Sequence, residues 1–279
     1  MRSRLQTLRS SVSLVLLLHC GVAATVHGAD KLAATVLVKD ALAAPRQEAT
    51  IEAKLLTKGL FRDSPLGGEP VDLVLNGATA ATGMTGGDGR AVLSLVPPTG
   101  RIVPVQVRVG NSPRVSAAEG QANLVVWERR TPVLVVEFSS LVEGSAGLQQ
   151  EMKPMPDAAD ELAKLSQFYY GLMYVVPAPA GADGFAAGAE ARQWLAGHKF
   201  PVGLVLTLPT SEEALGAKID ELHQAGWKAI KTGIGRSKAF AETFLRRRLD
   251  AVVVGESPTG EAPRKAKVAK DWKEVRKKL

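Results

Sequence analysis

The spacing of apolar residues changes near residue 130, and this change constrains the fold more than any other feature of the sequence. Before it, apolar and polar residues alternate in short segments such as IEAKLL (51–56), VDLVL (71–75) and VPVQVRV (103–109). A period of two is typical of strands in a sheet that buries one face. We therefore predict an antiparallel β-sandwich over residues 30–130.

Glycine and aspartate form the segment GGDG (86–89), which lies between the strand segments VDLVLNGATAATGMT (71–85) and RAVLSLV (90–96). These residue types supply the positive φ angles of a tight turn, so we predict a hairpin there. The strings GEPVDLVLNG and TGGDGRAVLSL, taken together, resemble the hairpin of bacterial immunoglobulin-like modules. The resemblance implies an immunoglobulin-like fold and hardly any function.

After residue 130 the chain alternates apolar strands with helical segments. The strands are PVLVVEF (132–138), YGLMYVV (170–176), VGLVLTL (202–208), KAIKTGIG (228–235) and DAVVVGE (250–256). One helix is predicted from a cap at Ser211 to Gly226. Five strands separated by helices predict a doubly wound parallel α/β sheet over residues 131–279. The join ERRTPV (128–133) is short, so we expect the two domains to pack rigidly.

The first residues have the order of a secretory signal. Three arginines precede an apolar run at residues 12–24, and small residues follow at 28–29. We predict a signal peptide over residues 1–29 and an exported protein, periplasmic or secreted. A retained anchor is the alternative, and lipid attachment at Cys20 is disfavoured by the bulky His19. Residues 30–279 contain no cysteine, so stability there does not depend on disulfides.

Net charge argues against a nucleic-acid partner. The chain carries +7, but the tail (264–279, RKAKVAKDWKEVRKKL) holds eight bases and two acids, and the rest of the mature chain is slightly acidic. In that tail Val268, Trp272, Val275 and Leu279 share one helical stripe. The tail either attaches to an anionic membrane or polymer, or docks on the sheet through Trp272. The second interpretation is favoured.

The second half resembles the haloacid dehalogenase (HAD) superfamily, in the branch related to lipin-like phosphatidate phosphatases. The resemblance is carried by PVLVVEFSSL, YVVPAPA, TGIGRSKAFAETFLRRRLDAVVVGE and DWKEVRKKL. It implies a HAD-like Rossmannoid fold and a phosphatase site. In such a site one aspartate attacks phosphorus and a second moves a proton, while a hydroxyl and a lysine hold phosphate and acidic residues hold Mg²⁺.

The residues at these positions have mostly lost the required groups. The vestigial positions that the resemblance implies are Glu137, Ser139, Leu141, Val176, Lys218, Arg236 and Phe240. Lys218 alone keeps a suitable group. We hypothesise that Arg236 replaces the metal by pairing with Glu137. The ligand-binding candidates are Glu137, Ser139, Ser140, Lys218 and Arg236.

Ordinary phosphatase chemistry is therefore not expected. The sequence favours a non-catalytic pseudophosphatase that binds an unknown envelope partner or an anionic ligand and needs no cofactor. The alternative is a divergent phosphohydrolase for a phosphomonoester or a phosphatidate-like substrate, using Glu137, Lys218, Arg236 and Mg²⁺. In a third hypothesis recognition lies on the sandwich.

Other residues have ordinary structural interpretations. His198 and His223 are expected at the surface rather than in a metal site. The aromatic run at 168–170 is expected to pack, and the segment 177–191 is expected to be a loop beside the pocket.

Overall fold

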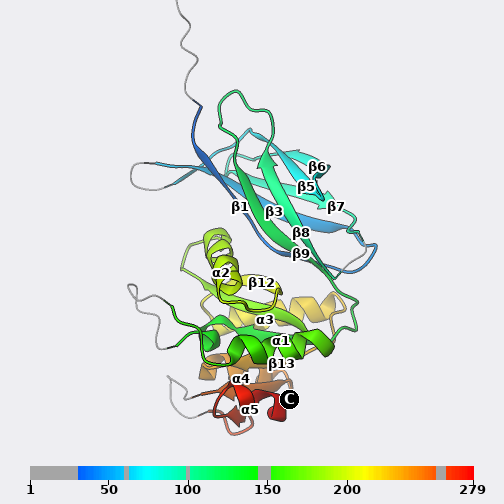
Figure 1. Ribbon diagram of the computed structural model, residues 1–279, viewed down its shortest axis with the longest axis vertical. Coiled ribbons are helices and arrows are strands. Elements are labelled where there is room, and N and C mark those ends of the chain that lie inside the picture. Colours follow the sequence, from blue (N-terminus) through cyan, green and yellow to red (C-terminus); the bar gives the residue numbers. More distant parts are fainter. Residues whose placement is uncertain (1–30, 60–62, 99–100, 144–151, 256–261) are drawn as a thin grey trace, which may run out of the picture. The chain divides into compact units, whose positions relative to one another are not determined.

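The computed structural model describes residues 31–59, 63–98, 101–143, 152–255 and 262–279 (Figure 1). The predicted signal peptide and the candidate lipid-attachment site at Cys20 lie outside these residues. In the described ranges, no helix combines the length and the apolar character needed to cross a bilayer. Residues 31–279 form one compact unit.

The amino-terminal part of this unit is a β-sandwich, here called the β lobe. One sheet has the order β1-β3-β4, with β7 also paired to β3, and the other has the order β2-β9-β8-β5-β6. The strand bounds are β1 (Ala34–Val38), β2 (Ala41–Ala43), β3 (Ala49–Thr57), β4 (Ser64–Pro65), β5 (Pro70–Leu75), β6 (Ala78–Met84), β7 (Arg90–Leu95), β8 (Ile102–Val109) and β9 (Glu119–Val126).

One apolar core lies between the two sheets. Alternate residues of β3, β5 and β9 point into it, and Ile51, Leu73 and Leu124 are fully buried. Burial of each such side chain contributes about 1.5–3 kcal/mol. The period of two in the sequence therefore predicted an amino-terminal β domain correctly.

The predicted hairpin at residues 86–89 is wrong in its pairing. The tight turn exists, because the Gly89 N–H donates to the Gly86 carbonyl at 2.8 Å and Gly89 has a φ of +74°. However, β6 pairs with β5 and β7 pairs with β3, so the turn carries the chain from one sheet to the other. The β5–β6 hairpin turns instead at Asn76 and Gly77, with φ angles of 49° and 81°, and Asn-Gly is itself a strong hairpin signal.

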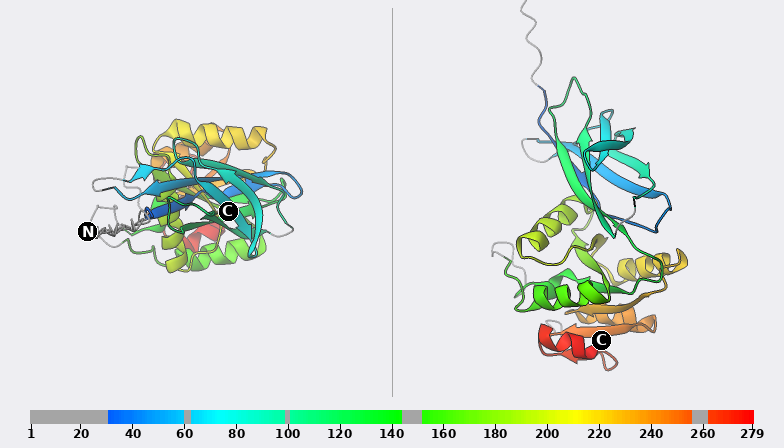
Figure 2. Two further views of the ribbon diagram at one scale, coloured as in Figure 1. Left: turned by 90° about the horizontal axis from the view of Figure 1, so that it is seen from above. Right: turned by 45° about the vertical axis from the view of Figure 1, so that its right-hand side comes forward.

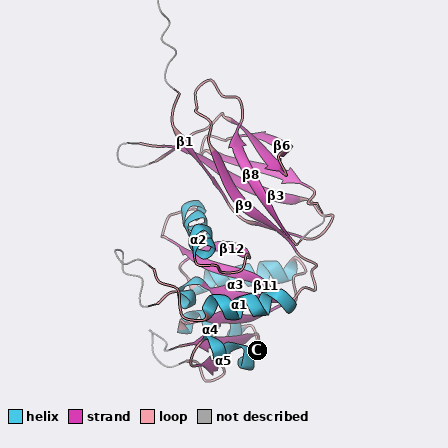
Figure 3. Cartoon of the chain, viewed as in Figure 1, coloured by secondary structure: helices cyan, strands magenta, loops and turns pink. Residues whose placement is uncertain are grey.

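The rest of the unit is a doubly wound parallel sheet flanked by helices, here called the α/β lobe (Figure 3). Its strand order is β12-β11-β10-β13-β14-β15. The strand bounds are β10 (Val133–Glu137), β11 (Gly171–Ala178), β12 (Leu204–Pro209), β13 (Ile230–Gly235), β14 (Asp250–Val254) and β15 (Lys267–Ala269). The helix bounds are η1 (Phe138–Leu141), α1 (Ala158–Phe168), α2 (Phe185–Gly197), α3 (Glu212–Gln224), α4 (Lys238–Arg246) and α5 (Trp272–Lys278).

Helices cover both faces of the parallel sheet (Figure 2). Side chains of α1, α2 and α5 share one apolar core with the sheet, and those of α3 and α4 share the other. Because both faces are covered, β10 is buried along Val133–Val136 rather than alternating. The predicted cap is confirmed: the Ser211 hydroxyl accepts the Ala214 N–H at 3.1 Å.

The tail docks on the sheet, as the favoured interpretation predicted, but not as one helical stripe. Val268 lies in β15 and is 48% exposed, while α5 begins at Trp272. Trp272 and Val275 are fully buried. The strand was missed because only three residues pair, and three residues carry no measurable period.

Two other local expectations are corrected. The segment 177–191 is not one loop, because β11 continues to Ala178 and α2 begins at Phe185. In the aromatic run, Phe168 and Tyr169 are 68% and 70% exposed, so neither packs in the core, whereas Tyr170 packs against the core as predicted.

The two lobes share apolar packing, in agreement with the short join. Trp127 at the end of the β lobe belongs to the core cluster that contains Val133 and Met173. A Cβ atom at Gly171 would lie 2.7 Å from the Trp127 ring, so β11 needs glycine where the ring crosses it.

Candidate functional site

The candidate site lies at the carboxyl edge of the parallel sheet, where β10 ends at Glu137. In the register, Val136 lies opposite Ile234 of β13, so Glu137 reaches the turn between β13 and α4. The carboxyl edge at the middle of a doubly wound sheet is where such folds place ligands. Glu137 is half-buried there.

Both carboxylate oxygens of Glu137 are occupied by hydrogen bonds. Glu137 Oε2 accepts the backbone N–H groups of Arg236 at 2.7 Å and Ser237 at 2.9 Å, and Oε1 accepts the Ser237 hydroxyl at 2.6 Å. Ser237 is also the N-cap of α4, and its Oγ accepts the Phe240 N–H at 3.2 Å. Glu137 thus extends the cap of α4 and places a negative charge at the positive end of this helix.

The hypothesised ion pair between Glu137 and Arg236 is replaced by a backbone contact. The Arg236 guanidinium donates to the Val142 carbonyl at 3.3 Å and approaches Met155 Sδ at 3.9 Å. Glu137 therefore contacts the main chain of Arg236, whereas the guanidinium points to the segment that follows η1. The sequence predicted that Glu137 and Arg236 lie close together, but it could not predict the direction of the Arg236 side chain.

Two other vestigial positions hold apolar side chains that are packed in the two cores of the α/β lobe, with Val176 in one core and Phe240 in the other. Val176 and Phe240 are only 5% exposed, and the ring of Phe240 lies 5.1 Å from that of Phe244. A Cβ atom at Gly235 would lie 2.4 Å from Phe240 and 2.7 Å from Glu137 Oε2, so side chains already fill this strand end. Apolar carbon therefore lies where a magnesium site needs oxygen ligands.

The two serines of η1 have different environments. The Ser140 side chain is buried and its hydroxyl donates to the Glu137 carbonyl at 2.7 Å, which closes the 3₁₀ turn. Ser139 is exposed. A serine hydroxyl with an ordinary pKa does not replace a carboxylic acid in proton transfer.

Lys218 lines a cavity that none of the other ligand-binding candidates lines. Lys218 is on α3, where its ammonium pairs with Glu221 at 2.7 Å. Both line a cavity of about 490 Å³ with Asp40 and Thr207, and none of Glu137, Ser139 and Arg236 lines it. The ligand-binding candidates are therefore not brought together at one site.

No metal site is formed by the residues that the structure describes: in them, no three His, Cys, Asp or Glu side chains gather within reach of one ion. His198 Nδ1 lies 2.9 Å from the Trp194 carbonyl, and His223 Nε2 lies 2.8 Å from the Ile230 carbonyl. Both histidines thus contact main-chain oxygen in their own part of the fold.

A buried ion pair that the sequence analysis missed joins the two lobes. The side chain of Asp40 is fully buried, and its Oδ1 lies 3.1 Å from Arg192 Nη1. Asp40 also accepts the backbone N–H groups of Asn123 and Val205, at 2.9 and 2.8 Å. Burial raises the pKa of the Asp40 carboxyl above its ordinary value, although Arg192 and these N–H donors oppose the rise.

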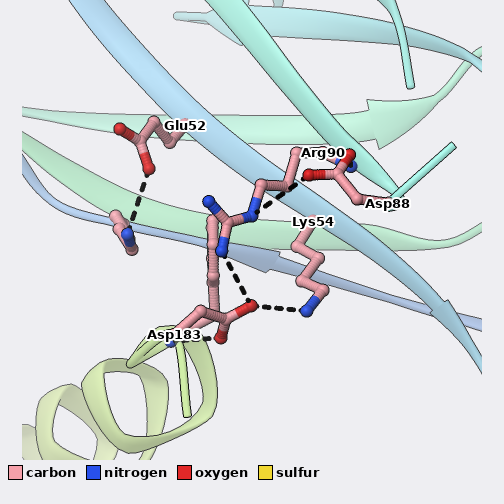
Figure 4. A network of polar contacts seen from close by, with 7 residues as sticks. Glu52, Lys54, Asp88, Arg90 and Asp183 are labelled. Carbon is pink, nitrogen blue, oxygen red and sulfur yellow. Dashed lines mark hydrogen bonds and ion pairs between the residues drawn. The ribbon is translucent and has the colours of Figure 1, made fainter. Parts of the chain in front are cut away.

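A second polar contact joins the lobes at the amino end of α2 (Figure 4). The Asp183 carboxylate bonds to the Lys54 ammonium and lies 3.4 Å from Arg90 Nη2, while its other oxygen accepts the Phe185 N–H at 3.3 Å. Burial raises the pKa of Asp183, but Lys54, the Phe185 N–H and Arg90 together outweigh it and hold the pKa below its ordinary value.

This lowered pKa predicts a pH-dependent contribution to stability. An acid with a depressed folded-state pKa stabilises the fold above its unfolded pKa, and the contribution is lost as the pH falls through the folded pKa. We expect Asp183→Asn to lower the free energy of unfolding at pH 7 by up to about 1 kcal/mol. Urea unfolding should show that the deficit shrinks as the pH falls below the ordinary pKa of an aspartate and through the lowered pKa of Asp183 in the folded state. The exposed Asp63→Asn is the control, and a deficit that does not change with pH would contradict the assignment.

Comparisons with known proteins assign neither a family nor an activity. No family model matches the chain, and no curated protein matches it. Among solved structures, titin domain M7 is 13% identical over 34% of this chain and 95% of its own, with a TM-score of 0.23. The adhesin InvE of Yersinia pseudotuberculosis is 16% identical over 37% of this chain and 34% of its own, with a TM-score of 0.24. A sialyltransferase from Photobacterium damsela is 10% identical over 81% of this chain and 43% of its own, with a TM-score of 0.23.

Proposed function

We propose that the protein is exported and serves the cell envelope as a non-catalytic binding or structural protein. In this proposal the β lobe is immunoglobulin-like, and the α/β lobe is a HAD-like domain that has lost its phosphatase groups. The position of the first strand, β10, in the middle of the parallel sheet supports the second assignment.

The observation that carries the proposal is the hydrogen bonding of Glu137. The residue at the position of the attacking aspartate accepts three hydrogen bonds, one from the Arg236 N–H and two from Ser237, the N-cap of α4. To attack phosphorus through Oε1, Glu137 would have to give up the Ser237 hydroxyl, while Oε2 stays bonded to the N–H groups of Arg236 and Ser237. Loss of one such hydrogen bond to a charged group costs about 1.5–3 kcal/mol.

The neighbouring positions add to the cost of catalysis. Ser139 cannot act as the general acid, a role that is typically worth about 10²- to 10⁴-fold in rate. Phe240 offers no ligand to a metal whose charge stabilisation would be worth several kcal/mol. The divergent phosphohydrolase requires Lys218 to hold phosphate beside Glu137, whereas Lys218 pairs with Glu221 and lines a cavity that Glu137 does not line.

Glu137→Gln tests whether this side chain is a structural cap. The amide would turn its NH₂ group toward at least one of three donors, so we expect the free energy of unfolding to fall by about 1–3 kcal/mol. Chemical denaturation monitored by circular dichroism measures the loss. Glu190→Gln, at an exposed position of α2, is the matched control and should change stability by less than about 0.5 kcal/mol. A Glu137→Gln protein as stable as the unmodified one would sink the cap assignment.

A further inference from the structure

A groove between the β lobe and α2 has the composition of a binding site. It has a volume of about 640 Å³. One wall is the outer face of β8 and β9, and the other is formed by α2 and the segment 200–205 that leads into β12. This volume lies in the range of small-molecule sites. None of the vestigial phosphatase positions lines the groove.

Side-chain amides dominate the polar lining. Gln106 and Gln121 lie opposite each other on β8 and β9. Asn123 lies opposite Pro104, two residues further along the same pair of strands. Gln193 faces the same groove from α2, and Asn76 from the β5–β6 turn. The Gln106 amide donates to Glu119 at 2.6 Å, and the Asn123 side chain bonds to Asp40. An amide such as that of Gln121 or Gln193 carries donors and an acceptor, so it can bind hydroxyl groups in either role.

The groove carries no unbalanced charge. Arg192 is the one charged residue among the described residues that line it, and the buried Asp40 carboxylate neutralises it. The Arg192 guanidinium also donates to the carbonyls of Val38 and Gln121, at 2.7 and 3.0 Å. A neutral ligand therefore suits this groove better than an anion or a cation.

The strands at the groove offer side chains rather than free main chain. β8 pairs with β5 and β9, and β9 pairs with β2 only at Leu124–Val126. Along the groove two of the outer main-chain groups of β9 are already bonded to side chains, because the Gln121 carbonyl accepts from Arg192 at 3.0 Å and the Asn123 N–H donates to Asp40 at 2.9 Å, so this is not an open edge. An extended peptide needs such an edge to add as a further strand. This geometry disfavours a peptide and favours a ligand that is recognised through its own hydroxyl groups.

Small apolar surfaces lie among the amides. Pro104 and Pro201 line the groove, and Val202 is 58% exposed there. They can pack against the C–H faces of sugar rings while the amides bind the hydroxyl groups. We infer that the groove binds a neutral oligosaccharide. The inference rests on the proposed binding role and names the class of ligand for it.

The probes are maltotetraose and tetra-N-acetylchitotetraose, titrated into the ¹⁵N-labelled protein. We expect saturable shifts of the side-chain NH₂ signals of Gln121 and Gln193 with at least one of the two sugars, with a Kd of about millimolar. Gln121→Leu and Gln193→Leu should each weaken binding by about tenfold. Gln224→Leu, at the exposed end of α3, should leave binding unchanged.

Absence of saturable shifts with both sugars would overturn the inference, and so would shifts that neither groove variant weakens. Saturable binding of a tetraalanine peptide in place of the sugars would assign the groove to a peptide. Amide dispersion and melting temperature confirm that each variant is folded. These outcomes are separate from the proposed lack of catalysis, because a phosphatase assay tests Glu137 and not the groove.

Discussion

Arg192→Ala is expected to lower the free energy of unfolding by about 3–5 kcal/mol, because it leaves the Asp40 carboxylate buried without its cationic partner. Asp40 has no exposed side-chain surface, and the Arg192 side chain is only 14% exposed. The substitution also removes the donors to the carbonyls of Val38 and Gln121. Since Arg192 belongs to the α/β lobe and its three partners belong to the β lobe, the loss should weaken the junction between the lobes.

Urea denaturation of the full chain measures this effect. Arg108→Ala is a matched control, because Arg108 forms a half-exposed pair with Asp72 at 3.5 Å, and such pairs contribute about 0–1 kcal/mol. The double variant Asp40→Leu with Arg192→Met should be more stable than Arg192→Ala, since it leaves no buried charge unpaired. A loss for Arg192→Ala no larger than that for Arg108→Ala would show that this pair does not hold the lobes together.

Trp272→Ala should destabilise the α/β lobe by about 3–5 kcal/mol, the usual cost of removing a buried tryptophan. Trp272 is fully buried, and its indole N–H donates to the Ser140 carbonyl at 3.2 Å. It fixes the first turn of α5 beside η1, so the basic tail is held on the fold at its middle, where α5 begins.

The exposed Val268→Ala is the control for Trp272→Ala, with an expected change below about 0.5 kcal/mol. Trp272→Phe should lie between the two, because it keeps most of the apolar contact but loses the indole hydrogen bond. Equal stability of Trp272→Ala and Val268→Ala would mean that the tail is not anchored through this side chain. Binding to anionic vesicles that depends on Trp272 would instead favour membrane attachment.

Periodicity predicted most of the fold because burial imposes it directly. The alternation in β3 follows from one buried face, and the continuous apolar run of β10 follows from two. The cap at Ser211 was also readable, because a side-chain oxygen and three following residues are a local arrangement. Pairing between strands that are distant in the sequence is not a local feature, so the sequence pattern could not identify β3 as the partner of β7.

The sequence predicted where the candidate site lies in the fold, but it did not predict which groups Glu137 contacts there. The end of β10 places Glu137 at the carboxyl edge of the sheet. Two of its three partners, however, are main-chain N–H groups about a hundred positions later, which side-chain identity does not reveal. Asp40 and Arg192 are separated by 152 positions, and each occurs in an ordinary local sequence. Such a pair could be found only from covariation between the two positions or from the fold itself.

The most direct test is hydrolysis of p-nitrophenyl phosphate and of phosphatidate by the purified full chain, each with and without magnesium. We expect phosphate release no faster than in a protein-free control, because Glu137 is bound at the cap of α4 and, among the described residues, no group of three possible metal ligands lies beside it. Magnesium-dependent turnover that Glu137→Gln abolishes and Glu190→Gln preserves would contradict the proposal and establish the protein as a phosphohydrolase.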